Sequence, residues 1–105
     1  MPTDADPEKL RETIAAVLTE GGYASETEAM RDLSLTIALA KVSTYERECR
    51  RFQRKYGRSF EELRDQVERQ TGDEDFQVDD DLLDWEFASR ALTHWRNRLH
   101  VLQNA

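Results

Sequence analysis

The fold is decided by residues 26–56, ETEAMRDLSLTIALAKVSTYERECRRFQRKY, which contain neither proline nor glycine. Apolar side chains recur there at alternating intervals of three and four residues, the spacing of one face of an α-helix. They are Leu35, Ala38, Val42, Tyr45, Cys49, Phe52 and Tyr56. A seam of about three heptads is typical of a helix that packs lengthwise against another helix. β-Branched residues and a serine at positions 41–44 weaken helix propensity, so the sequence leaves open whether this helix is continuous.

Capping residues and glycines mark the ends of this helix and of its neighbours. Ser25 followed by Glu28, and Ser59 followed by Glu62, are capping boxes, and Gly57 lies between the two helices that they predict. Asp6 before Pro7 predicts an earlier helix start. We therefore expect helices at about 7–20, 26–56, 60–70 and 80–103, a tail over 1–6 and an acidic connection over 73–79.

The last of these helices carries a seam that matches the seam of the long helix. Its members are Trp85, Ala88, Leu92, Trp95, Leu99 and Leu102. The sequence therefore predicts a single all-α domain over 1–105, with three to four helices and the long central helix packed antiparallel against the C-terminal helix. We expect the first helix to fold back onto Met30, Leu33 and Ile37.

Composition excludes several classes of protein. The chain has 105 residues, a formal charge of −7, one cysteine and 4 glycines. It has no apolar run long enough to cross a membrane, and its acidic start, MPTDADPEKL, is unlike a secretory signal. A single cysteine forms no disulfide within the chain, and so few glycines build no glycine-rich phosphate loop.

Five arginines are concentrated near the end of the long helix, at Arg47, Arg50, Arg51, Arg54 and Arg58. A row of arginines is typical of a surface that binds phosphates, which predicts a nucleic-acid-binding regulator as one alternative. The other interpretation is structural. In an antiparallel pair these arginines would face the acidic residues 73–81 and stabilise the fold.

The acidic stretch predicts a surface for a basic protein partner, formed by Asp73, Glu74, Asp75, Asp79, Asp80 and Asp81. It also resembles a calcium loop, but Val78 stands where an EF-hand needs glycine and Asp84 stands where it needs glutamate. His94 and His100 are six residues apart and belong to no metal-binding pattern, and Cys49 lies on the apolar seam.

We accordingly expect no enzyme, no cofactor and no metal site. An enzyme of undefined type remains a third alternative, and it would use the helical carboxylates Glu46, Glu48, Asp84 and Glu86.

Residues 8–40 resemble the two helices of a ribbon-helix-helix antitoxin. The resemblance rests on the turn and capped helix start Gly22-Tyr23-Ala24-Ser25-Glu26-Thr27-Glu28-Ala29. Proteins of that family read DNA with a basic strand before the first helix. Residues 1–7 are acidic and contain two prolines, so no DNA-reading residue is carried over. The remaining chain resembles small helical proteins encoded beside toxins. The resemblance implies a cytoplasmic antitoxin that binds and neutralises a basic, ribonuclease-like toxin.

Apolar residues occupy more than one face of the first half of the long helix. They are Met30, Leu33, Leu35, Ile37 and Leu39. One short helix covers only one side, and an uncovered apolar patch usually marks an interaction site. We therefore expect this patch to form a homodimer, or to be covered by the toxin instead.

Overall fold

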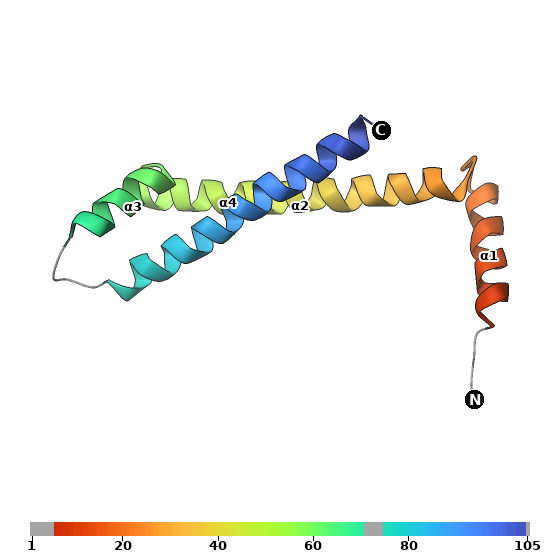
Figure 1. Cartoon of the computed structure of the whole chain (residues 1–105), viewed down its shortest axis with the longest axis horizontal. Helices are drawn as coiled ribbons and strands as arrows, with labels where there is room; N and C mark the ends of the chain where they lie inside the picture. Colours follow the sequence, from red (N-terminus) through yellow and green to blue (C-terminus); the bar gives the residue numbers. More distant parts are fainter. Residues whose placement is uncertain (1–5, 71–74, 105) are drawn as a thin grey trace. The chain divides into compact units, whose positions relative to one another are not determined.

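The computed structural model describes residues 6–70 and 75–104. Over these ranges the chain forms four helices and no strand: α1 (Pro7–Glu20), α2 (Glu26–Tyr56), α3 (Phe60–Arg69) and α4 (Phe76–Gln103) (Figure 1). The all-α class is confirmed, and α2 continues without a break through residues 41–44. The contacts divide the chain into two compact units, residues 1–36 and residues 37–105. The single-domain organisation stays a prediction.

Side chains cap the helix starts at the predicted positions. Asp6, which precedes Pro7, accepts a hydrogen bond from the backbone N–H of Glu8 at 3.1 Å. Ser25 accepts from Glu28 at 3.1 Å, and the Glu28 carboxylate accepts in return from the N–H of Ala24 at 2.9 Å. Gly57, at φ 63°, follows the end of α2, a left-handed conformation that favours glycine.

The start of α4 differs from the prediction. Asp75 caps the helix by accepting from the N–H groups of Gln77 at 3.1 Å and Val78 at 3.4 Å, so α4 begins at Phe76 and not near residue 80. The prediction of a connection before the helix is therefore wrong for residues 76–79, and residues 73 and 74 lie outside the described ranges. Carboxylates suit the first turn because the helix dipole is positive there. The acidic run begins a helix instead of preventing one.

The second capping box and the end of α3 agree with the sequence to within a residue. Ser59 accepts from the N–H of Glu62 at 3.1 Å, and α3 ends at Arg69. In the predicted tail, residues 1–5 lie outside the described ranges, and Asp6 belongs to the cap of α1.

Residues 37–105 are held together by an aromatic core where α2, α3 and α4 meet. Phe52, Leu63 and Trp85 are its buried members. The Trp85 ring stacks on Phe52 with centroids 5.7 Å apart and on Tyr56 at 6.3 Å, and Phe60 meets it edge-on at 5.7 Å. Such ring pairs stabilise a fold beyond the area that they bury. Trp85 thereby joins the end of α2 and the start of α3 to α4.

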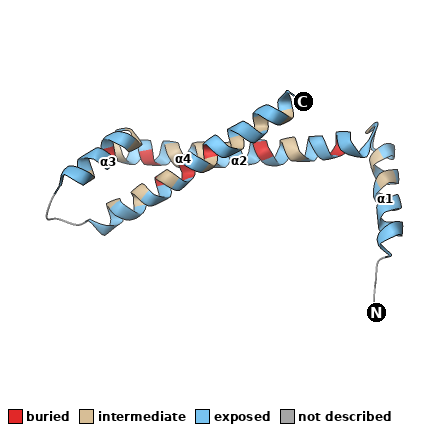
Figure 2. Ribbon diagram, in the orientation of Figure 1, coloured by how far each residue is buried: buried red, intermediate tan, exposed pale blue. Residues whose placement is uncertain are grey.

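The cross-helix contacts show that α4 runs antiparallel to the second half of α2. Lys55 near the end of α2 pairs with Asp81 near the start of α4 at 2.6 Å, whereas Glu46, further back on α2, pairs with Arg96 at 3.1 Å. The packing of the long helix against the C-terminal helix is thus confirmed. Within this unit the predicted seam residues are all buried or half-buried. Figure 2 shows the buried and half-buried residues as red and tan bands along α2 and α4.

Residues 6–36 have little buried surface. No residue of α1 is buried, and Leu10, Ile14 and Val17 are 53%, 48% and 58% exposed. Met30 and Leu33 are both 62% exposed, so the expectation that α1 covers them is wrong. The hydroxyl of Tyr23, in the turn between α1 and α2, donates a hydrogen bond to Asp32. A side chain of the turn therefore contacts the first turns of α2 where we expected α1.

A small residue in the buried seam predicts sensitivity to added volume. Ala88 is 3% exposed, so Ala88→Leu should overpack the interior of this unit and lower the free energy of unfolding by roughly 1–3 kcal/mol. The neighbouring Ser89→Leu adds a similar side chain at an exposed position and should change it by about 0.5 kcal/mol or less. Urea unfolding followed by circular dichroism measures both, and equal losses would contradict close packing at Ala88.

Candidate functional site

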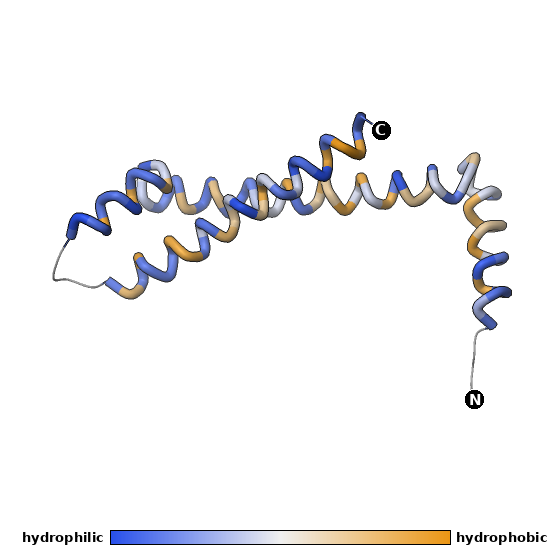
Figure 3. The backbone as a smooth tube through the Cα atoms, viewed as in Figure 1, coloured by the Kyte–Doolittle hydropathy of each residue, from blue (hydrophilic) through white to orange (hydrophobic). Residues whose placement is uncertain are grey.

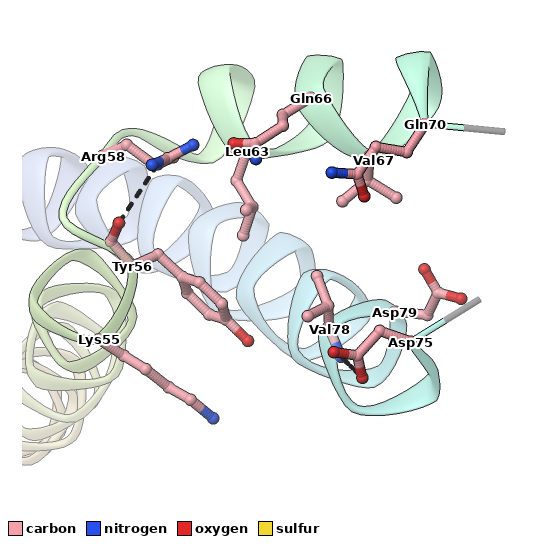
Figure 4. Close-up of a pocket in the computed structure, with 10 residues that line it drawn as sticks. All are labelled: Lys55, Tyr56, Arg58, Leu63, Gln66, Val67, Gln70, Asp75, Val78 and Asp79. Atoms are coloured by element: carbon pink, nitrogen blue, oxygen red, sulfur yellow. Dashed lines mark hydrogen bonds between the residues drawn. The ribbon is translucent and has the colours of Figure 1, made fainter. Parts of the chain in front are cut away.

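A cavity of about 400 Å³ lies between the end of α2, α3 and the start of α4 (Figure 4). Leu63 and Val67 on α3 and Val78 on α4 form its apolar lining. The other lining residues are polar or charged: Lys55, Tyr56, Arg58, Gln66, Gln70, Asp75 and Asp79. Among the described residues, no serine, cysteine or histidine lines it. Three of the charged groups already have partners, since Asp75 caps α4, Lys55 pairs with Asp81 and Arg58 donates to a backbone carbonyl.

Asp81 connects α4 to the end of α2. Its carboxylate oxygen Oδ2 accepts from Lys55 Nζ at 2.6 Å and from the hydroxyl of Tyr56. The hydrogen bond from Lys55, followed by that from Tyr56, lowers the pKa of Asp81. Desolvation by burial and the hydrogen bond to Asp81 raise the pKa of Tyr56 to about 12. At neutral pH the tyrosine is therefore a donor and the aspartate an ionised acceptor.

The described members of the predicted acidic surface differ in their exposure and contacts. Asp81 is half-buried and engaged with Lys55 and Tyr56, so it contributes to the fold. Asp75 and Asp79 line the cavity. Asp80 is exposed and forms no ion pair within the part of the chain that the structure describes. Asp73 and Glu74 lie outside the described ranges.

Four of the five predicted arginines stay together, whereas the fifth does not. Arg47, Arg50, Arg51 and Arg54 line a shallow hollow of about 320 Å³ on the surface of α2. Arg58 lies beyond Gly57, where the helix has ended. It donates from Nε to the carbonyl of Tyr56 at 3.3 Å and lines the 400 Å³ cavity.

The structural interpretation of the arginines explains only part of their contacts. Arg51 pairs with Glu48 at 3.1 Å and Arg50 with Glu46 at 3.7 Å, both within α2. The predicted link to the acidic stretch is made by Lys55, not by an arginine. Arg47 and Arg54 form no ion pair in residues 6–70 and 75–104, so these two guanidinium groups are available to an anion.

The predicted dimer patch is distributed over both units. In the first, Met30 and Leu33 are 62% exposed, but Leu35 is half-buried. In the second, Ile37 is 44% and Leu39 52% exposed, while Ala38 between them is fully buried. At about 100° per residue, Leu35 and Leu39 share one side of the helix, and Met30, Leu33 and Ile37 another.

The surroundings of Cys49 disfavour the thiolate form of its side chain. Cys49 is half-buried in the seam, and burial raises the pKa of its thiol although Arg96 acts to lower it. In residues 6–70 and 75–104, no cluster of three or more His, Cys, Asp or Glu side chains has an arrangement that could hold a metal ion.

Comparison with family models, with curated proteins and with solved structures gives no match for this chain. In the described part of the chain, no helix combines the length and the apolar character needed to cross a membrane.

Two features of residues 37–105 were not predicted from the spacing of apolar residues in the sequence. The cavity depends on the gap between α3 and α4, which no periodicity encodes. The second is a row of exposed apolar residues on α4, formed by Phe76, Leu83 and Phe87 at 72%, 65% and 64% exposure. Their spacing of seven and four residues was available in the sequence, but the stronger tryptophan seam masks it.

The contacts of Asp81 predict an acid-sensitive contribution to stability. Because its pKa is lowered in the folded protein, the contribution is complete above the unfolded value of about 3.9 and is lost as pH falls through the lower folded value. At pH 7, Asp81→Asn should lower the free energy of unfolding by about 1–2 kcal/mol, and the difference from the unaltered protein should disappear in acid.

Asp84→Asn is the matched control, since it removes the same charge from an exposed position one turn along α4. Urea unfolding between pH 3 and pH 7 measures all three proteins. An Asp81→Asn loss that is independent of pH would contradict the ionic contribution.

Proposed function

We propose that this protein is a non-enzymatic interaction module, and that α1 is a docking surface for another protein. The observation that carries the proposal is the exposed apolar row of Leu10, Ile14 and Val17 on a helix with no buried residue. Figure 3 shows that hydrophobic and hydrophilic positions alternate along α1. A helix whose apolar stripe faces water gains stability when a partner covers that stripe. An amphipathic helix laid into an apolar groove is a recurrent mode of protein recognition.

The partner that this proposal favours is a basic toxin, and the protein is then an antitoxin in the cytoplasm. Support comes from the resemblance of residues 8–40 to antitoxin helices and from the net charge of −7. Exposed carboxylates at Asp79, Asp80 and Asp84 on α4 would attract a basic partner. Asp81 is excluded from this role because Lys55 and Tyr56 already engage it.

The product of the neighbouring gene is the first partner to test. Expressed alone it should arrest growth, and co-expression with this protein should restore growth and yield a complex that co-purifies. Ile14→Glu should weaken the purified complex by roughly tenfold or more, because a carboxylate would have to be desolvated in an apolar contact.

Thr13→Glu places the same charge on the adjacent exposed position of α1 and should leave the complex intact. Calorimetry on the purified proteins measures both variants. A neighbouring product without toxicity would overturn the antitoxin assignment, and equal affinities for Ile14→Glu and the unaltered protein would overturn the docking surface.

The arginine hollow supports a second candidate, a nucleic-acid-binding regulator. Four guanidinium groups line one surface of α2, and two of them have no ion-pair partner among the described residues. Phosphate contacts make affinity fall with salt in proportion to their number.

If this candidate holds, generic duplex DNA or RNA should bind measurably at 50 mM salt and much more weakly at 200 mM. The double variant Arg47→Glu/Arg54→Glu should abolish that binding, whereas Arg69→Glu on α3 should change it little. Fluorescence anisotropy measures the affinities, and an absence of salt-sensitive binding would remove this candidate.

A further inference from the structure

The outer side of α4 carries a second apolar row, distinct from the seam that packs against α2. Phe76, Leu83, Phe87 and Val101 are each 64–72% exposed. At about 100° per residue these four positions fall on one side of the helix, and the buried Trp85, Ala88 and Leu92 fall on the opposite side. Only Phe87 has a ring contact across this unit, an edge contact with Tyr45 at 6.0 Å, and it stays largely exposed.

The charges along this row are divided by sign. Asp80 lies between Phe76 and Leu83, in the acidic half of the helix, while Arg90 follows Phe87 in the basic half. Asp80 has no ion-pair partner among the described residues. The Arg90 side chain is 79% exposed, and its ion pair with Glu86 at 2.6 Å leaves further N–H donors facing water.

This pattern is complementary to itself when a second copy of α4 lies antiparallel to the first. Positions 76, 80, 83, 87, 90 and 94 follow the alternating spacing of four and three residues that defines a coiled-coil seam. One register places Leu83 opposite Phe87 of the other copy and Asp80 opposite its Arg90, each pair occurring twice by symmetry. A parallel pairing would instead place aspartate against aspartate and arginine against arginine.

We propose that the protein forms an antiparallel homodimer through this outer face of α4, with a second copy of the chain as the occupant. Charge complementarity along the row selects the second copy, because the same helix supplies both halves of each ion pair. The interface differs from the α2 residues that the sequence suggested. It uses no residue of α1, so its test does not depend on the toxin.

Charge exchange between positions 80 and 90 tests the arrangement on the isolated protein. Light scattering at micromolar concentration should give about 25 kDa, twice the 12.3 kDa chain. Asp80→Arg alone and Arg90→Asp alone should each shift the mass to that of a monomer, since each places two like-charged pairs in the interface. The double variant Asp80→Arg/Arg90→Asp should restore the dimer.

Mixing the two single variants should also restore a mass of about 25 kDa, because every opposed pair is then of opposite charge. Glu68→Arg on α3 makes the same change in net charge outside the row and should stay dimeric. A monomeric unaltered protein would overturn the proposal. A dimer that persists in both single variants would also overturn the proposal. If that persistent dimer is lost in Leu39→Glu, the interface lies on α2 instead. Neither result bears on toxin binding, which is measured separately through Ile14→Glu.

Discussion

The packing of Trp85 against three other aromatic rings holds residues 37–105 together. Phe52 and Tyr56 come from α2, Phe60 from α3 and Trp85 from α4, so one side chain contacts the three helices of this unit. Phe52 is the one large side chain that is fully buried in the described part of the chain. A thin pair of helices buries a small fraction of its surface, so each aromatic contact has an unusually large share in its stability.

Ionic contacts around this core fix its geometry more than they add to its stability. Asp81 lies one turn before Trp85 and joins Lys55 and Tyr56, which orients the ring that stacks on Trp85. Glu46 and Arg96 form a second, more exposed link further along the pair. Exposed ion pairs contribute little free energy each, but opposite charges at both places favour this direction and register of the helices.

Much of this fold was predictable because its signals are local. Ser25, Ser59 and Gly57 each act on a neighbouring backbone group, and the seam of α2 is read from spacing alone. The predictions that were wrong concern features that no single local pattern decides. The spacing of apolar residues in α1 does not reveal that the side chain of Tyr23, and not α1, contacts the first turns of α2. The start of α4 depends on which of several aspartates caps the helix, and the sequence alone does not single out Asp75. Arg58 does not lie with the other arginines, because the backbone turns at Gly57 and α2 ends before Arg58. The exposed apolar row on α4 and the cavity become visible only once the helices are packed together.

The concentration of aromatic rings at one end of the α2–α4 pair has a consequence for how this unit opens. Trp85 is 2% exposed, whereas Trp95, Leu99 and Leu102 are only half-buried and Val101 is 65% exposed. Backbone amides in the last turns of α4 are therefore held by few buried contacts and exchange with solvent through local fraying. Amides around Trp85 exchange only when the aromatic core itself separates. The helix thus has a gradient of protection along its length, and its C-terminal end can rearrange against another surface at small free-energy cost while the aromatic end keeps its structure.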